Sequence, residues 1–133
     1  MKQQHSFFLW GSILAMLAVV LGAFTTHTLS EMISPVQLAS FRTGVRYQFY
    51  HAFALLLLGV IQQQNPTISY KGVGRFFIIG TLLFSLSIYL LATKDLTHIS
   101  TKILGPLTPI GGLSLILGWG QMIWLSYKGW KGE

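Results

Sequence analysis

Four long apolar stretches, separated by short polar segments, account for most of this chain. They cover residues 7–24, 45–61, 76–92 and 107–127. Each stretch approaches the ~20 residues that a helix needs to cross ~30 Å of hydrocarbon. The pattern therefore predicts an all-α integral membrane protein, a four-helix bundle formed by a single membrane domain over residues 1–133.

The connection between the first two stretches carries a helix-start signal of its own. Ser34 and Gln37 have the spacing of a capping box, and Pro35 stands at the first helical position. A helix should therefore begin near Pro35. It either continues through Gly44 into the second crossing, or it lies on the membrane surface and bends at Gly44. The predicted fold includes the surface alternative, a short interfacial helix between the first and second transmembrane helices.

Small residues recur at helical spacing and predict close packing between the helices. Lipid offers no hydrophobic drive for helix association, so small residues that let backbones approach favour it. Gly111 and Gly112 of the last stretch are expected to face a neighbouring helix. In the first stretch, one face is formed by Gly11, Ala15, Ala18 and Gly22.

Composition and charge agree with a lipid environment. Hydrophobic residues make up 52% of the 133 residues and charged residues 9%, whereas a soluble domain usually carries about 25% charged residues. The net charge of +6 would suggest nucleic acid in a soluble protein. Here the basic residues flank the apolar stretches, where they meet anionic headgroups. Membrane lipids are therefore the expected partners, and no nucleic acid is expected.

The distribution of Lys and Arg suggests an orientation. With four crossings both termini share one side, which carries five of these residues against four on the other. The bias becomes stronger if two of the four, Arg42 and Arg46, belong to the second helix rather than to a loop. The positive-inside rule then predicts cytoplasmic termini, most simply in a bacterial inner (plasma) membrane.

The sequence lacks the residues that several kinds of transport and catalysis require. The apolar stretches contain no Asp or Glu, and the chain has no Cys. Transporters of protons and cations commonly use acidic residues at depth, and thiolate chemistry needs Cys. Gly-rich phosphate loops and nucleophile elbows are also missing. The sequence therefore predicts a non-enzymatic protein with no catalytic residue, no metal site and no cofactor.

The candidate site is a polar cluster at the start of the second stretch. Helical spacing puts Arg42, Arg46 and Tyr50 on one face of this helix, and Tyr47 with His51 on the adjacent face. The end of the first stretch and the start of the last stretch should lie on the same side of the membrane as this cluster. The candidate residues for binding a lipid headgroup or another anion are Arg42, Arg46, Tyr47, Gln48, Tyr50, His51, His27 and Thr108.

Two other interpretations of this cluster stay open. In the first, which we favour, the arginines snorkel to the interface while Tyr, Gln and His form interhelical hydrogen bonds. In the second, His27 and His51 are the axial ligands of a haem.

Several segments together resemble a known family. They are residues 22–27 (GAFTTH), 41–52 (FRTGVRYQFYHA), 83–90 (LFSLSIYL) and 107–113 (LTPIGGL), followed by Gly118 and Trp119. They are similar to small four-helix membrane proteins of unknown function, the YgdD and transmembrane protein 256-like family (domain of unknown function 423). Leu86 stands where that family usually has Gly. The resemblance implies an integral membrane protein with no established reaction, and a shared core of Arg46, Tyr47, Gln48, Tyr50, His51, Ser85, Tyr89, Thr108 and Pro109.

Three hypotheses for function follow. The leading one is an accessory subunit of, or binding partner for, a larger membrane complex such as a respiratory assembly. The alternative is a protein that binds a lipid or small molecule in a polar pocket near Arg46 and His51. The third is an electron-transfer protein that carries haem or quinone.

Overall fold

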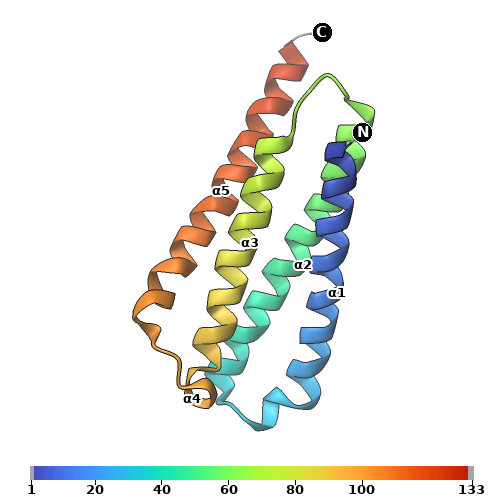
Figure 1. Ribbon diagram of the computed structural model, residues 1–133. Coiled ribbons are helices and arrows are strands. Elements are labelled where there is room, and N and C mark those ends of the chain that lie inside the picture. Colours follow the sequence, from blue (N-terminus) through green and yellow to red (C-terminus); the bar gives the residue numbers. More distant parts are fainter. Residues whose placement is uncertain (1, 132–133) are drawn as a thin grey trace.

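The computed structural model of the protein describes residues 2–131 as helices joined by short connections. Over these residues there is no β-strand. Successive long helices run in opposite directions, so the first and last described residues lie at the same end of the molecule (Figure 1). The long helices are α1 (Lys2–His27), α2 (Pro35–Gln64), α3 (Lys71–Ala92) and α5 (Thr101–Lys131), and the short ones are the 3-10 helix η1 (Leu29–Glu31) and α4 (Lys94–Thr97).

Three segments are long and apolar enough to cross a membrane. They are Lys2–Glu31, Pro35–Gln64 and Lys71–Ala92. The fourth apolar stretch also forms a helix, α5, but this helix is not among the three found in the described residues. Its apolar residues are interrupted by Pro106, Pro109 and several glycines. The predicted count of four crossings is therefore not confirmed by helix length and composition.

The start of α2 confirms the capping box. The Gln37 backbone N–H donates to Ser34 Oγ over 3.3 Å, and the Ser34 backbone N–H donates to Gln37 Oε1 over 3.0 Å. From Pro35 the helix runs unbroken to Gln64, so the predicted interfacial helix is not confirmed. Only η1 lies between α1 and α2.

The helix continues through Gly44, where a neighbouring helix fills the space that this glycine leaves. A Cβ atom on Gly44 would lie 2.7 Å from Cε1 of Tyr89 on α3. The hydroxyl of Ser85, also on α3, donates to the Gly44 carbonyl over 2.9 Å. Gly44 is thus a point of close helix approach within an unbroken helix.

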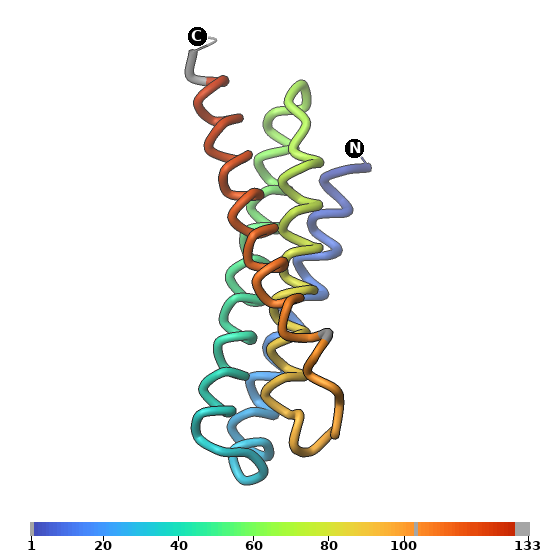
Figure 2. Tube along the Cα trace, turned by 90° about the vertical axis from the view of Figure 1, so that its left-hand side faces the viewer, coloured from blue at the N-terminus to red at the C-terminus, as the bar shows by residue number. Residues whose placement is uncertain are grey.

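The helices form an open row that consists of two hairpins. Packing is most extensive between α1 and α2 and between α3 and α5, and the hairpins meet where α2 packs against α3. Figure 1 shows α1 and α5 on the outer sides of this row, and Figure 2 views it from the side of α5, which lies in front. The main buried cluster includes Leu55 and Leu58 of α2 with Val73 and Phe77 of α3. The row therefore has its core along the α2–α3 contact.

A buried amide links three of the helices. Gln48 of α2, with 4% of its surface exposed, donates from Nε2 to the Leu14 carbonyl of α1 over 2.9 Å. Its Oε1 accepts a hydrogen bond from the Tyr89 hydroxyl of α3 over 2.8 Å. Gln48 therefore connects the two hairpins through polar contacts inside the core.

The distance between α3 and α5 is set by Gly111. A Cβ atom on Gly111 would lie 2.8 Å from the Phe84 Cα atom, in conflict with the backbone of α3. A Cβ on Gly112 would lie 3.6 Å from the Phe84 ring, which is an ordinary contact. Both glycines face α3, as predicted, but only Gly111 is required for the close approach.

Replacing Gly111 should therefore destabilise the protein. Gly111→Leu forces α5 away from α3, and overpacking of this kind typically costs about 1–3 kcal/mol. The matched control is Gly120→Leu on the same helix, because a Cβ on Gly120 has no neighbour within 4 Å. We expect a lower melting temperature in detergent for Gly111→Leu only. Equal melting temperatures for the two variants would contradict the assigned contact.

The amide link yields a second prediction. Gln48→Leu leaves the Tyr89 hydroxyl without its partner, and the loss of such an interhelical contact costs about 1–2 kcal/mol. Gln63→Leu, at an exposed position of the same helix, should change stability far less. Adding Tyr89→Phe to Gln48→Leu should recover part of the loss, since the orphaned hydroxyl is removed. Additive losses in this double-mutant cycle, measured by thermal unfolding in detergent, would show that the two side chains act independently.

Candidate functional site

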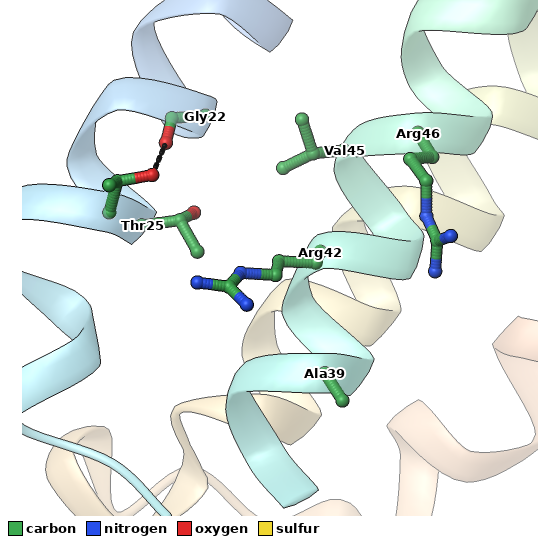
Figure 3. Close-up of a pocket in the computed structure, with 7 residues that line it drawn as sticks. Gly22, Thr25, Ala39, Arg42, Val45 and Arg46 are labelled. Carbon is green, nitrogen blue, oxygen red and sulfur yellow. Dashed lines mark hydrogen bonds between the residues drawn. The ribbon is translucent and has the colours of Figure 1, made fainter. Parts of the chain in front are cut away.

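A groove lies between α1 and α2 near the end of the molecule that holds η1. Its volume is about 500 Å³. Arg42 and Arg46 stand one helical turn apart on α2 and provide its charges (Figure 3). We call this the arginine groove, and it is lined by Gly22, Thr25, Thr26, Ala39, Arg42, Val45 and Arg46.

The α1 wall of the arginine groove is neutral. The Thr25 hydroxyl donates to the Leu21 carbonyl over 2.6 Å, and the Thr26 hydroxyl donates to the Gly22 carbonyl over 3.2 Å. Both protons are therefore used within α1, and no side-chain charge comes from this helix. A Cβ placed on Gly22 would make only an ordinary contact, 3.8 Å from Val45 Cγ1.

The two guanidinium groups are exposed and have few protein partners. Nη2 of Arg46 donates to the Thr43 hydroxyl over 3.3 Å. Among residues 2–131, Arg42 makes no hydrogen bond or ion pair, and its side chain extends towards Thr25 (Figure 3). No Asp or Glu lines the described groove. Most of the N–H donors of this pair are thus available to an anion.

An apolar groove continues from the arginine groove along the same helix contact. It has a volume of about 240 Å³ and is lined by Ala18, Val19, Val45, Arg46, Phe49 and Tyr50. Val45 and Arg46 belong to both grooves. One continuous surface between α1 and α2 therefore joins a cationic end to an apolar end.

His51 faces a different set of neighbours. The indole N–H of Trp119 on α5 donates to His51 Nε2 over 3.2 Å, and His51 Nδ1 lies 2.8 Å from the Tyr47 carbonyl. Because an indole nitrogen only donates, Nε2 accepts and the proton sits on Nδ1. The ring also packs edge-on against Phe77 of α3 at 5.4 Å between centroids. His51 therefore links α2 to α3 and α5.

The structure does not form the predicted pocket that includes both Arg46 and His51. Because they are five positions apart, Arg46 and His51 lie on different faces of α2, one towards α1 and the other towards α3 and α5. Tyr47 is turned towards Phe84 of α3 at 4.9 Å, whereas Tyr50 lines the apolar groove. Of the predicted set, only Arg42, Arg46 and Tyr50 lie along the α1–α2 surface.

The other predicted residues are distributed over the molecule. Gln48 is the buried link described above, and the Thr108 hydroxyl lies 2.7 Å from that of Ser87, joining α5 to α3. His27 is exposed at the end of α1. Thr108 and His27 therefore do not contribute to the arginine groove.

The geometry contradicts a haem held between His27 and His51. His51 lies near the level of Leu14, which Gln48 contacts, and Leu14 is 13 residues, or ~20 Å, from His27 along α1. Both ring nitrogens of His51 already have partners. Over the part of the chain that the structure describes, no three His, Cys, Asp or Glu residues are grouped to hold a metal ion.

Two features of these surfaces were missed from the sequence. The α1 wall includes Gly22 and Ala18, whose spacing with Gly11 had indicated only close packing. Trp119 was given no role in the candidate site, yet its indole N–H donates to His51. The position of Trp119 beside Gly118, in a segment that resembles the family, was the sequence feature that could have indicated a role.

Comparisons with known proteins agree with the family resemblance. A family model described as "Protein of unknown function (DUF423)" matches residues 21–112, which include both arginines of the groove. A UPF0382 membrane protein of Staphylococcus aureus (strain bovine RF122 / ET3-1) is 39% identical over 122 residues, covering 92% of this chain and 95% of the relative. The UPF0382 inner membrane protein YgdD of Escherichia coli (strain K12) is 36% identical over 115 residues, covering 86% and 84%. No solved structure matches the chain. The chain therefore belongs to the DUF423 family and is a helical membrane protein of unknown function.

Proposed function

We propose that this protein is a non-enzymatic membrane protein that binds an anionic lipid along the contact between α1 and α2. Arg42 and Arg46 hold the headgroup phosphate, and the apolar groove holds an acyl chain. The observation that carries the proposal is that the cationic and apolar grooves share Val45 and Arg46. A phospholipid has the same order of parts, a charged group followed by a hydrocarbon chain.

The chemistry of the arginine groove suits a phosphate. Guanidinium groups bind phosphate oxygens through two parallel N–H···O bonds, which are stronger than neutral hydrogen bonds. Arg42 donates to no acceptor in the described chain, and Arg46 donates one hydrogen bond, to the Thr43 hydroxyl. Because no Asp or Glu lines the groove, an incoming anion would not compete with a protein carboxylate for the two guanidinium groups.

The depth of the arginines fits a headgroup. The 30 residues of α2 span ~45 Å, which exceeds the ~30 Å hydrocarbon core. Arg42 lies seven residues, or ~10 Å, after Pro35, close to the expected boundary. Helical side chains lean towards the N-terminus, so Arg46 reaches back in the direction of Arg42.

The proposal includes α5 as a fourth crossing, with both termini in the cytoplasm. This helix has 31 residues and packs along α3, which is itself a candidate span. A helix that lies alongside a membrane-crossing neighbour for most of its length shares its depth. In this orientation the arginine groove opens towards the outer leaflet of the membrane.

The predicted role as an accessory subunit of a larger membrane complex stays a second candidate. It is supported by the outer side of α5, where Ile116, Ile123 and Trp124 are more than half exposed. In an open row this side is available to a partner helix. Co-purification with large subunits in mild detergent would favour this role over lipid binding alone.

Loss of both charges in the arginine groove should release the lipid. In Arg42→Gln/Arg46→Gln, the phosphate loses its charge-assisted contacts, and we expect at least a tenfold drop in retained phosphatidylglycerol by native mass spectrometry. The control is Lys94→Gln/Lys102→Gln, which removes the same charge at the same end of the helices. Both variants should keep the wild-type melting temperature. An equal drop in both would indicate nonspecific electrostatic attraction and would contradict a site at the arginines.

The proposed topology can be tested with reporters fused to the two termini. Four crossings place both reporters in the cytoplasm, since the end that holds the termini also holds Lys2, Lys71 and Arg75. Fusions at either end should give cytoplasmic activity in whole cells. Reporters on opposite sides of the membrane would mean three crossings, with α5 outside the hydrocarbon.

A further inference from the structure

A third groove lies between α1 and α3, and its floor is formed by α2. Its volume is about 440 Å³, within the range of small-molecule sites. Leu17 and Val20 of α1 and Leu82 and Leu86 of α3 form part of its walls, with 40–58% of each side chain exposed. The groove therefore opens sideways, where the surrounding medium is lipid.

Polar side chains lie at the bottom of this otherwise apolar groove. Gln48, Ser85 and Tyr89 line it, and each has its own hydrogen bond within the protein. Thr81 also lines it, is 1% exposed, and its Oγ1 atom has no hydrogen-bond partner among the described residues. A buried hydroxyl without a partner costs free energy. An occupant that bonded to Thr81 would remove this cost.

The position of Thr81 restricts the chemistry of the occupant. It is the eleventh of the 22 residues of α3, ~15 Å from either helix end and therefore near the middle of the hydrocarbon. Phospholipids keep their ester carbonyls and charged groups at the interface, so only their chains reach this depth. A molecule that brings a hydrogen-bond acceptor to Thr81 must be neutral and soluble in the bilayer core.

We propose that this groove binds a neutral lipophile of the isoprenoid-quinone type, in which an apolar chain carries a ring with carbonyl oxygens. A ring carbonyl accepts a hydrogen bond from the Thr81 hydroxyl. The chain leaves the groove sideways, between the exposed apolar walls on α1 and α3, into the surrounding hydrocarbon. The site shares no lining residue with the arginine groove, so the two proposals are independent.

Thr81→Val tests the hydrogen bond at nearly constant shape. The full chain is placed in phosphatidylcholine nanodiscs, and the dissociation constant of a decyl-substituted benzoquinone is measured by equilibrium binding. Thr81→Val should weaken binding about fivefold to tenfold, as expected for the loss of one neutral hydrogen bond. Thr67→Val, at an exposed position outside both grooves, should not change it. Decylbenzene, which lacks carbonyls, should bind the wild type more weakly than the benzoquinone does. Its dissociation constant should be the same for the wild type and for Thr81→Val.

A second pair of variants tests the location without relying on Thr81. Leu86→Trp fills the mouth of the groove and should block the benzoquinone, whereas Leu113→Trp, at an equally exposed position on α5, should not. Circular dichroism melting checks that all variants remain folded. Unchanged binding in Thr81→Val or in Leu86→Trp would overturn the proposal. The proposal would also be overturned if Thr81→Val weakened the binding of methyl oleate but not the binding of the benzoquinone.

Discussion

The arrangement of this protein depends on the amide of Gln48. Inside a bilayer no water is present to satisfy a polar side chain, so an amide at this depth must find its partners on neighbouring helices. Gln48 finds them on both sides, at the Leu14 carbonyl and the Tyr89 hydroxyl. These contacts fix the rotation of α2 about its axis. That rotation in turn places Arg46 towards α1 and His51 towards α3 and α5.

Small side chains allow the helices to approach closely on either side of the Gln48 contacts. Gly44 admits the Tyr89 ring beside α2, and Gly111 admits the Phe84 backbone beside α5. Serine hydroxyls then bond to carbonyls across these contacts, as Ser114 does to the Phe76 carbonyl over 3.0 Å. Close approach and hydrogen bonding therefore occur at the same places, as expected where apolar burial gives no preference for helix over lipid. The grooves remain where α1 does not meet its neighbours this closely.

Local features of the chain were predictable from sequence, whereas features that depend on neighbouring helices were not. The capping box at Ser34 and Gln37 and the helical character of all four apolar stretches follow from residue types and spacing. The close contact of α2 with α3 at Gly44 does not, because it depends on a residue of the neighbouring helix, Tyr89. Spacing likewise gave the angle between Arg46 and His51 but not which helix each would face. The pairing of His51 with Trp119 joins positions 68 residues apart and needs the placement of α5.

The division of the row into two hairpins has a consequence for biogenesis. Each hairpin holds its own most extensive packing, α1 with α2 and α3 with α5, so each can form as a unit in the order of synthesis. The later step is lateral docking of the second unit on the first, through Tyr89 to Gln48 and Ser85 to Gly44. Two nascent copies at high density offer one another the same docking surfaces. Exchange of hairpins between copies is thus the assembly error to which this architecture is most exposed.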